Sequence, residues 1–243
     1  MFSFLKKYKR KVRPHCAALV AAAGSSSRMG GVNKLLEDLE GMPVLARTLT
    51  ALQLADKVDE IVVATREEDL VEISSLCKTY GITKCTKVVR GGETRVHSVL
   101  LAAMEVSPET DLLAVQDGAR PLVTPELIDD VISAARRCSA AAPAVAVKDT
   151  VKAVKADGAV EKTLVRETLR AVQTPQVFDA ELLRAALQSA IDQKLPVTDD
   201  CSAVELIGKT VYLVEGDEEN IKITTPKDLI VAAAFLRARE GRI

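Results

Sequence analysis

A glycine- and serine-rich segment near the beginning of the chain carries two cations that could bind phosphate. The segment G-S-S-S-R-M-G-G-V-N-K, residues 24–34, contains Arg28 and Lys34 and follows the apolar run 16–21. Small residues let a backbone approach a ligand closely, and successive N–H groups in such a turn can surround phosphate oxygens. The spacing fits neither G-x-G-x-x-G nor a G-K-[ST] ending, and the serines do not form a G-x-S-x-G elbow. The segment therefore predicts a longer loop that contacts several phosphates of a triphosphate, with a surface loop that binds nothing as the alternative.

Further polar clusters directly follow other apolar runs. R-G-G-E-T-R, residues 90–95, is followed by Ser98 one turn into the next predicted helix. D-G-A-R-P begins with Asp117 and includes Arg120. A carboxylate at such a position can bind Mg²⁺ or a ligand hydroxyl, whereas a surface ion pair with Arg120 is the alternative for Asp117. The remaining clusters of this kind are K-D-T (148–150), A-V-Q-T-P-Q (171–176), V-T-D-D (197–200) and E-N-I-K-I-T-T-P (219–226).

The elements that position these clusters are strands and helices in alternation. Apolar runs of strand length occupy residues 16–21, 60–65, 85–89, 111–116, 141–147 and 210–214. Apolar residues recur at helical spacing, about 100° per residue, in residues 43–55, 93–105 and 125–137. Such an alternation predicts an α/β fold, a Rossmann-like, mostly parallel sheet with helices on both faces. Ligands bind such sheets at the carboxyl ends of the strands, where the polar clusters are expected to meet.

One segment departs from this alternation and predicts a protruding β-hairpin arm. Residues 149–163 alternate weakly in hydropathy around Asp157-Gly158, which is a strong hairpin turn signal. An isolated two-stranded hairpin is marginally stable in water. We therefore expect an arm at about residues 149–166 that lies against something else, and a partner subunit is a reasonable candidate.

Composition and charge exclude several classes of function. The formal net charge of −1 gives the chain no overall field for binding nucleic acid. The five cysteines form no C-x-x-C pair, which argues against a zinc site or a disulfide framework and for a reducing compartment. The basic segment 1–14 has too short an apolar part for a signal peptide or a membrane span. We expect a solvated tail, a single domain at 15–243, and a cytoplasmic protein that binds neither nucleic acid nor membrane.

Taken together, the motifs resemble those of the 2-C-methyl-D-erythritol 4-phosphate cytidylyltransferase family of the non-mevalonate isoprenoid pathway. The resemblance extends from about residue 15 to the C-terminus and includes, in the family's order, A-A-G-S-S-S-R-M with N-K, G-G-E-T-R-x-x-S, D-G-A-R-P, V-K-D-T, A-V-Q-T-P-Q, T-D-D and N-I-K-I-T-T-P. It implies transfer of CMP from CTP to methylerythritol phosphate, which gives 4-diphosphocytidyl-2-C-methyl-D-erythritol and pyrophosphate. It also implies a divalent cation, normally Mg²⁺, and a homodimer whose hairpin arms interlock.

The resemblance further implies roles for individual residues. Arg28 and Lys34 would stabilise charge on the triphosphate, and Arg166 and Lys222 would hold the acceptor phosphate. Asp117 would lie beside the nucleotide as the candidate metal ligand. The residues implied around cytosine and ribose are Ala22, Ala23, Gly24, Gly92, Glu93 and Ser98. The residues implied on the acceptor side are Asp117, Arg120, Thr150, Thr174 and Thr198, of which Thr150, together with Arg166, could serve the partner's site.

The implied chemistry agrees with the residue types present. The acceptor is a phosphate and already an anion, so it needs no general base, and neither His15 nor His97 has a spacing typical of catalysis. Cations must instead bring two anions together. The alternatives are ribitol 5-phosphate cytidylyltransferase, a sugar-phosphate nucleotidyltransferase that uses another base, and a non-catalytic nucleotide-binding paralogue. Arg166 in V-R-E-T and the A-V-Q before T-P-Q favour the methylerythritol substrate over ribitol phosphate. The presence of Arg28, Lys34 and Asp117 argues against the paralogue.

Overall fold

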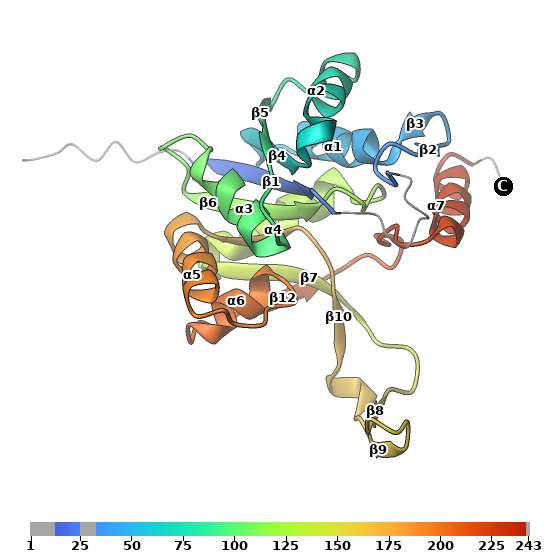
Figure 1. Ribbon diagram of the computed structural model, residues 1–243. Helices are drawn as coiled ribbons and strands as arrows, with labels where there is room; N and C mark the ends of the chain where they lie inside the picture. Colours follow the sequence, from blue (N-terminus) through green and yellow to red (C-terminus); the bar gives the residue numbers. More distant parts are fainter. Residues whose placement is uncertain (1–12, 25–32, 242–243) are drawn as a thin grey trace, which may run out of the picture.

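The computed structural model describes residues 13–24 and 33–241, so Arg28 and most of the expected basic tail lie outside the described residues. One half of the main sheet is parallel, in the order β5-β4-β1-β6 (Figure 1). These strands are β1 (Cys16–Ala22), β4 (Glu60–Thr65), β5 (Cys85–Arg90) and β6 (Leu112–Asp117). The apolar runs predicted these strands to within a residue or two at each end.

The other half of the sheet is mixed. It contains β7 (Ala140–Ala146), β10 (Arg170–Val172), β11 (Gln176–Asp179) and β12 (Tyr212–Glu215). Strand β11 pairs antiparallel with both β6 and β7, β10 pairs antiparallel with β7, and β12 pairs parallel with β7. The prediction of a mostly parallel sheet is confirmed, and β10 and β11 are additions that the apolar runs did not indicate.

Helices cover both faces of the sheet (Figure 1). They are α1 (Val44–Leu54), α2 (Leu70–Thr79), α3 (Arg95–Met104), α4 (Pro125–Cys138), α5 (Ala180–Asp192), α6 (Asp200–Leu206) and α7 (Pro226–Arg239). The two core clusters divide the helices between the faces, with α1, α2, α4 and α7 on one and α3, α5 and α6 on the other. Successive side chains of a strand point to opposite faces, and β1 accordingly sends Ala18 to the first cluster and Leu19 to the second.

Side-chain caps fix the starts of two helices near the predicted site. Thr124 caps α4, because its hydroxyl accepts a hydrogen bond from Leu127 N, and Pro125 occupies the first helical turn. Thr94 caps α3 in the same way and accepts a hydrogen bond from His97 N. The beginning of α3 is therefore held directly behind the loop at Gly91–Glu93.

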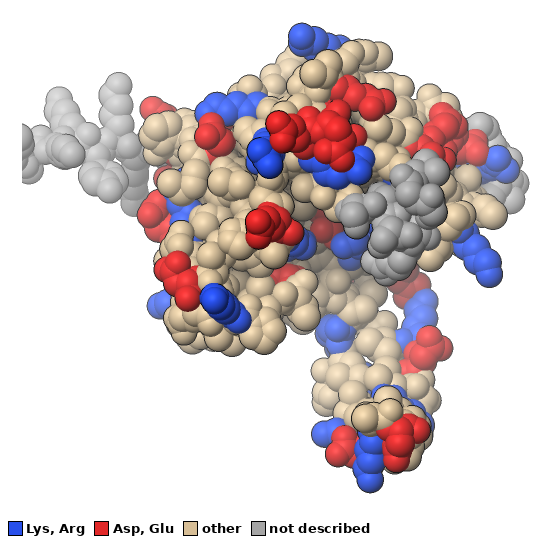
Figure 2. All heavy atoms as spheres, in the orientation of Figure 1, with Lys and Arg blue, Asp and Glu red and all other residues tan. Residues whose placement is uncertain are grey.

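The expected hairpin arm is present and projects from the sheet between β7 and β10 (Figure 1). It contains β8 (Lys152–Val154), β9 (Val160–Thr163) and the 3-10 turn η3 (Arg166–Thr168). Gly158 adopts a φ of +85°, a conformation that glycine tolerates best and that explains the glycine at the turn. Acidic and basic side chains are mixed on the surface of the arm (Figure 2).

Smaller elements complete the described chain. They are β2 (Asp38–Leu39), β3 (Met42–Pro43) and the 3-10 turn η2 (Glu67–Asp69). Within residues 13–24 and 33–241, none of the helices is both long enough and apolar enough to cross a membrane.

Candidate active site

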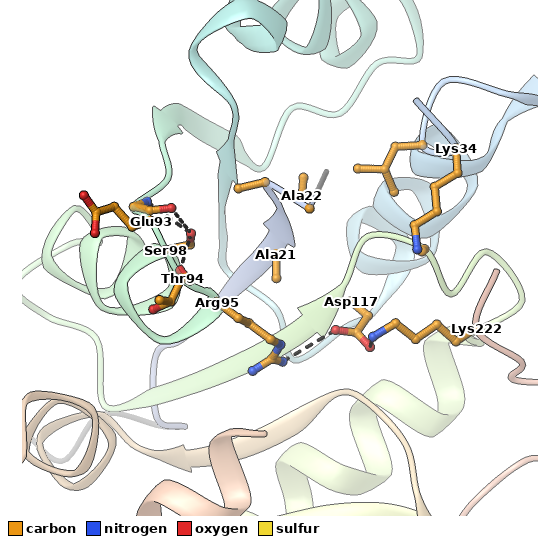
Figure 3. Close-up of a pocket in the computed structure, with 14 residues that line it drawn as sticks. Ala21, Ala22, Lys34, Glu93, Thr94, Arg95, Ser98, Asp117 and Lys222 are labelled. Atoms are coloured by element: carbon orange, nitrogen blue, oxygen red, sulfur yellow. Dashed lines mark hydrogen bonds and ion pairs between the residues drawn. The ribbon is translucent and has the colours of Figure 1, made fainter. Parts of the chain in front are cut away.

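A cavity of about 320 Å³ opens at the carboxyl ends of β1, β5 and β6 (Figure 3). Its walls combine small residues with charged ones: Ala21, Ala22, Ala23, Gly24, Lys34, Leu35, Gly92, Glu93, Thr94, Arg95, Ser98, Asp117, Ala119 and Lys222. Strand β1 lies between β4 and β6, so the order of the strands reverses there. The cavity therefore occupies the topological switch point, where open α/β sheets bind ligands.

The loop after β5 is held in place by Ser98. The Ser98 hydroxyl accepts a hydrogen bond from Gly92 N at 3.1 Å and lies 2.9 Å from the carbonyl of Thr94, to which it donates. A Cβ atom on Gly91 would lie 2.7 Å from Ala23 Cβ and 2.8 Å from Ser98 Oγ, closer than such atoms approach in practice. Gly91 therefore lets the loop after β5 lie against the loop after β1, and Ser98 shapes the nucleotide side of the cavity by fixing that loop.

Asp117, the last residue of β6, contacts three described cations. Its Oδ2 atom is 2.7 Å from Lys222 Nζ, and its Oδ1 atom is 3.5 Å from Arg95 Nη2 (Figure 3). The Oδ2 atom also lies 3.6 Å from Arg120 Nε. Burial alone would raise the pKa of Asp117, but Lys222 and Arg95 outweigh it and lower the pKa. Asp117 is therefore a carboxylate that balances the charge of the cations around the cavity.

Arg95 is a site residue that the sequence reasoning did not single out. It lines the cavity from the first turn of α3, and its Nη1 atom is 2.6 Å from Asp200 Oδ2. Burial alone would lower the pKa of Arg95, but Asp200 and Asp117 outweigh it and raise the pKa, so Arg95 remains a cation. The signal was available in the final Arg of R-G-G-E-T-R and in T-D-D, but nothing in the local sequence connects two residues 105 positions apart.

Asp200 is fully buried at the beginning of α6. Its Oδ1 atom has no hydrogen-bond partner among the residues that the structure describes, and burial raises the pKa of Asp200, an effect that Arg95 offsets only in part. The Gln176 side-chain oxygen accepts hydrogen bonds from the backbone N–H groups of Asp200 and Cys201, both at 3.0 Å. Strand β11 thus fixes the beginning of α6, and Asp200 in turn holds Arg95 toward the cavity.

Arg120 and Thr174 belong to the wall behind Asp117. Arg120 donates from Nη1 to the Asn220 carbonyl at 2.6 Å, and Thr174 Oγ1 accepts a hydrogen bond from Asp117 N at 3.1 Å. Asn220 donates from its side chain to the Thr174 carbonyl at 3.0 Å. Thr174 is buried, so its hydroxyl supports the end of β6 and does not point into the cavity.

Lys34 approaches the cavity from the side opposite to Arg95. Its Nζ atom donates to the Ile223 carbonyl at 2.9 Å, and Ile223 N donates to the Ala119 carbonyl at 2.8 Å. These bonds connect Lys34 with the segment that carries Lys222. Arg28, the other predicted cation of that loop, lies outside the described residues.

Besides Arg120 and Thr174, three described residues predicted for the site do not line this cavity. Arg166 and Thr150 are exposed on the arm, where Arg166 Nη1 donates to the Lys148 carbonyl at 2.9 Å. Thr198 is exposed just before α6, and its N–H donates to Ser202 Oγ at 3.1 Å. Within the single chain, the cavity brings together Gly24 and Lys34 with the loop after β5 and the end of β6, and the arm lies apart from it.

A Rossmann-like sheet with small-residue loops beside its switch point and a cavity lined by cations defines a nucleotide-binding enzyme of the nucleotidyltransferase class. Comparison with known proteins is more specific. The chain belongs to the IspD family, 2-C-methyl-D-erythritol 4-phosphate cytidylyltransferase, whose family model matches residues 16–238. It is 44% identical over 230 residues to the 2-C-methyl-D-erythritol 4-phosphate cytidylyltransferase of Pelotomaculum thermopropionicum, covering 93% of this chain and 96% of that one. It is 45% identical over 225 residues to the corresponding protein of Desulforamulus reducens, covering 91% and 96%.

Solved structures agree with these relatives. The crystal structure of 4-diphosphocytidyl-2C-methyl-D-erythritol synthase from Anaerococcus prevotii matches with a TM-score of 0.83 and 32% identity, covering 92% of this chain and 96% of that one. The resemblance seen in the motifs is thereby confirmed. The chain is a CTP-dependent cytidylyltransferase of isoprenoid precursor biosynthesis, which transfers CMP from CTP to 2-C-methyl-D-erythritol 4-phosphate and releases pyrophosphate.

Proposed function

We propose that the cavity at the ends of β1, β5 and β6 binds CTP and presents its α-phosphate to the acceptor phosphate. The observation that carries this proposal is that small-residue loops and the cations Lys34, Arg95 and Lys222 line one cavity. Small residues leave room for the base and ribose, and cations attract the triphosphate. In this proposal, cytosine and ribose lie against Ala22, Ala23, Gly24, Gly92, Glu93 and the loop that Ser98 fixes.

The residues act on a displacement at the α-phosphorus. An oxygen of the acceptor phosphate forms a bond to this phosphorus as the bond to the oxygen that bridges to the β-phosphate breaks, and pyrophosphate leaves with that electron pair. Because the attacking oxygen is already an anion, the step removes no proton. The protein must align two anions and stabilise the charge that develops on the leaving group, which is the role proposed for Arg28 and Lys34.

The acceptor phosphate is proposed to bind beside Lys222. This lysine is 39% exposed although its Nζ atom contacts Asp117, so it can contact a ligand without losing that ion pair. Arg120 and Thr174 support the acceptor side through their contacts with the end of β6. Thr198 belongs to this side only if the loop before α6 moves toward the cavity.

Mg²⁺ is proposed to arrive with CTP. Among the described residues, no group of three or more His, Cys, Asp or Glu side chains could hold a metal ion. Mg²⁺ takes one or two carboxylates together with phosphates and water, so Asp117 fits as a protein ligand of a metal held mainly by the triphosphate. The ion would neutralise phosphate charge when bound.

A homodimer is proposed to bring the arm of one protomer to the active site of the other. Thr150 and Arg166 would then reach the partner's acceptor phosphate, which accounts for their distance from the cavity of their own chain. The arm exposes apolar side chains at Val154 (59%), Val160 (58%) and Val165 (63%), which a second copy would cover. Light scattering tests this, with Val165→Asp expected to yield monomers. Val71→Asp, at an 82% exposed position on α2, is the matched control and should leave the dimer intact.

The decisive assay is pyrophosphate release by the purified protein with CTP and Mg²⁺, comparing methylerythritol 4-phosphate with ribitol 5-phosphate. Release with the first alone supports the proposed site and justifies testing Lys222 and Arg166 as acceptor ligands. Release with ribitol 5-phosphate would overturn the acceptor assignment. No pyrophosphate release with either acceptor, in a folded protein that still binds CTP, would contradict the catalytic roles.

The Mg²⁺ proposal is tested by omitting the metal from the same assay. The proposed location is the cytoplasm, and the unpaired cysteines are consistent with its reducing conditions.

A further inference from the structure

A second cavity, of about 430 Å³, lies between the end of α2 and the beginning of β5. It shares no lining residue with the active site. Cys77 and Cys85 both line it, together with Lys78 and Lys87. A small reagent that enters this cavity therefore meets two thiols and two cations.

The two thiols are held against each other by the backbone. Their sulfur atoms lie 3.6 Å apart, which is contact distance for two sulfurs that are not bonded. Ile82 connects the two residues, because Ile82 N donates to the Cys77 carbonyl at 2.9 Å and Cys85 N donates to the Ile82 carbonyl at 3.2 Å. A disulfide needs a sulfur separation of about 2.05 Å. Side-chain rotation that closes about 1.5 Å is the movement required.

The pair differs chemically from the other three cysteines. The hydrogen bond between the two side chains lowers the pKa of Cys77 and raises the pKa of Cys85, so Cys77 is the thiol of the pair that loses its proton more readily. Burial raises the pKa of Cys16 and of Cys201 far above the ordinary range. Cys138 contacts backbone carbonyls and has no thiol beside it. Because the thiolate is the reactive form of cysteine, we expect Cys77 to react before the other four cysteines.

We propose that Cys77 and Cys85 form a redox-active dithiol that peroxide converts into an intramolecular disulfide. The Cys77 thiolate attacks one peroxide oxygen, the O–O bond breaks, hydroxide leaves, and the product is a sulfenic acid. The Cys85 sulfur then attacks the Cys77 sulfur, the S–S bond forms, and the sulfenic oxygen leaves as water with the Cys85 proton. The two thiols lose two electrons, and hydrogen peroxide is reduced to two molecules of water.

The location gives the reaction a structural consequence. Strand β5 runs from Cys85 to Arg90 and continues into Gly91 and Gly92 at the active site. The disulfide would attach the beginning of this edge strand covalently to α2. It leaves the residues of the catalytic cavity chemically unchanged, so the oxidation can be measured independently of cytidylyl transfer.

The test is oxidation of the full chain with hydrogen peroxide, followed by thiol counting, intact mass and peptide mapping. The five thiols should fall to three, with a mass loss of about 2 Da from two hydrogens and a crosslinked peptide that joins Cys77 to Cys85. Dithiothreitol should restore all thiols. Cys77→Ser and Cys85→Ser should each abolish the crosslink, whereas the matched control Cys138→Ser should retain it.

Two results would overturn the proposal in the wild-type protein alone, so the outcome does not depend on how the variants fold. One is loss of Cys138 thiol at the same rate as loss of Cys77 thiol. The other is accumulation of sulfinic acid or disulfide-linked dimers without the internal crosslink. Pyrophosphate release is measured separately in the reduced protein. A failure of the active-site proposal can therefore be distinguished from a failure of the dithiol proposal.

Discussion

Replacing Asp117 with asparagine should destabilise the protein, because this carboxylate lies against three described cations. Lys222 is 2.7 Å from it, Arg95 3.5 Å and Arg120 3.6 Å. The Asp117 side chain is only 10% exposed, so water can replace little of the lost charge. The amide has nearly the shape of the carboxylate, and the substitution therefore removes charge without opening a cavity.

The size of the destabilisation depends on which contacts each of the three cations keeps when the Asp117 charge is removed. Removing one partner of a buried ion pair costs about 3–5 kcal/mol. Lys222 is 39% exposed and can be hydrated, and Arg95 keeps Asp200 at 2.6 Å, which leaves Arg120, 12% exposed, as the cation with the largest loss. Because the other two cations keep water or a second carboxylate, we expect the free energy of unfolding to fall by about 2–3 kcal/mol, at or just below the lower limit of that range. In a chain of this size such a loss lowers Tm by roughly 4–12 °C.

The loss should depend on pH in a direction set by the pKa of Asp117. Burial alone would raise this pKa, but Lys222 and Arg95 lower it below its ordinary value. A lowered folded-state pKa contributes stability above the unfolded pKa of about 3.9, and the contribution disappears as the pH falls through the folded-state pKa. The difference between wild type and Asp117→Asn should thus be full at neutral pH and shrink below about pH 4.

Urea unfolding at a series of pH values measures this difference, and urea, being uncharged, does not screen the ion pairs. Glu105→Gln is the matched control, because it removes a carboxylate 2.8 Å from Lys87 in a pair whose side chains are about half exposed. We expect the control to cost less than about 1 kcal/mol. If Asp117→Asn costs no more than the control at neutral pH, or if its cost is constant on acidification, the reasoning from charge balance is refuted.

The same variant separates charge balance from metal binding. Without the Asp117 carboxylate, the cations around the cavity are less neutralised, so CTP binding measured in EDTA should be at least as tight as in the wild type. The further gain in CTP affinity on adding Mg²⁺ should be smaller in Asp117→Asn if this carboxylate is a metal ligand. An unchanged gain would remove Asp117 from the metal site.

Other substitutions test the remaining residues of the cavity. Lys34→Ala should lower kcat far more than CTP affinity, because a cation near the triphosphate acts mainly on charge that develops in the transition state; near-normal turnover would end that role. Asp200→Asn releases Arg95 and should lower kcat/KM by roughly tenfold, equivalent to about 1.4 kcal/mol. Arg95→Lys should also lower kcat/KM, because a lysine cannot contact two carboxylates in the same geometry. Steady-state kinetics at saturating and limiting CTP would detect either change, and wild-type values would contradict it. Gly91→Ala places a Cβ 2.7 Å from Ala23 Cβ, so CTP binding by calorimetry should weaken while the fold survives at a cost of about 1–3 kcal/mol; unchanged affinity would count against close contact of the two loops.

The sequence pattern predicted α1, α3 and α4 and missed α2, α5, α6 and α7. Helices α2 and α5 each bury one face at helical spacing, so their pattern was present and was not used. In α4, Leu127, Ile128, Val131 and Ile132 are buried at helical spacing, and the sequence pattern located this helix almost to the residue. In α7 apolar side chains are distributed around the axis, and Ile230, for example, is 73% exposed. Helix α6 has only seven residues, too few to display a period.

The residues of the site were also predicted only in part. Site residues within a single loop can be recognised from the sequence, because phosphate-binding turns need small residues and cations within a few positions of each other. The motif in 90–95 was therefore visible, whereas the ion pair of Arg95 with Asp200 was not. Its two halves come from the beginnings of different helices, and only their distance in the folded chain makes them partners.

The sequence by itself determined the class of fold, the loops that meet at one edge of the sheet, the hairpin arm and the family, because each depends on neighbours in the chain or on motifs in a fixed order. The tertiary structure decided which side chains neutralise one another and which face the cavity. It joined Lys222 and Arg95 through Asp117, buried Thr174 behind the end of β6, and left Arg166 on the arm. Charge pairing and burial depend on distances across the packed sheet, and the spacing of residues along the chain carries no measure of those distances.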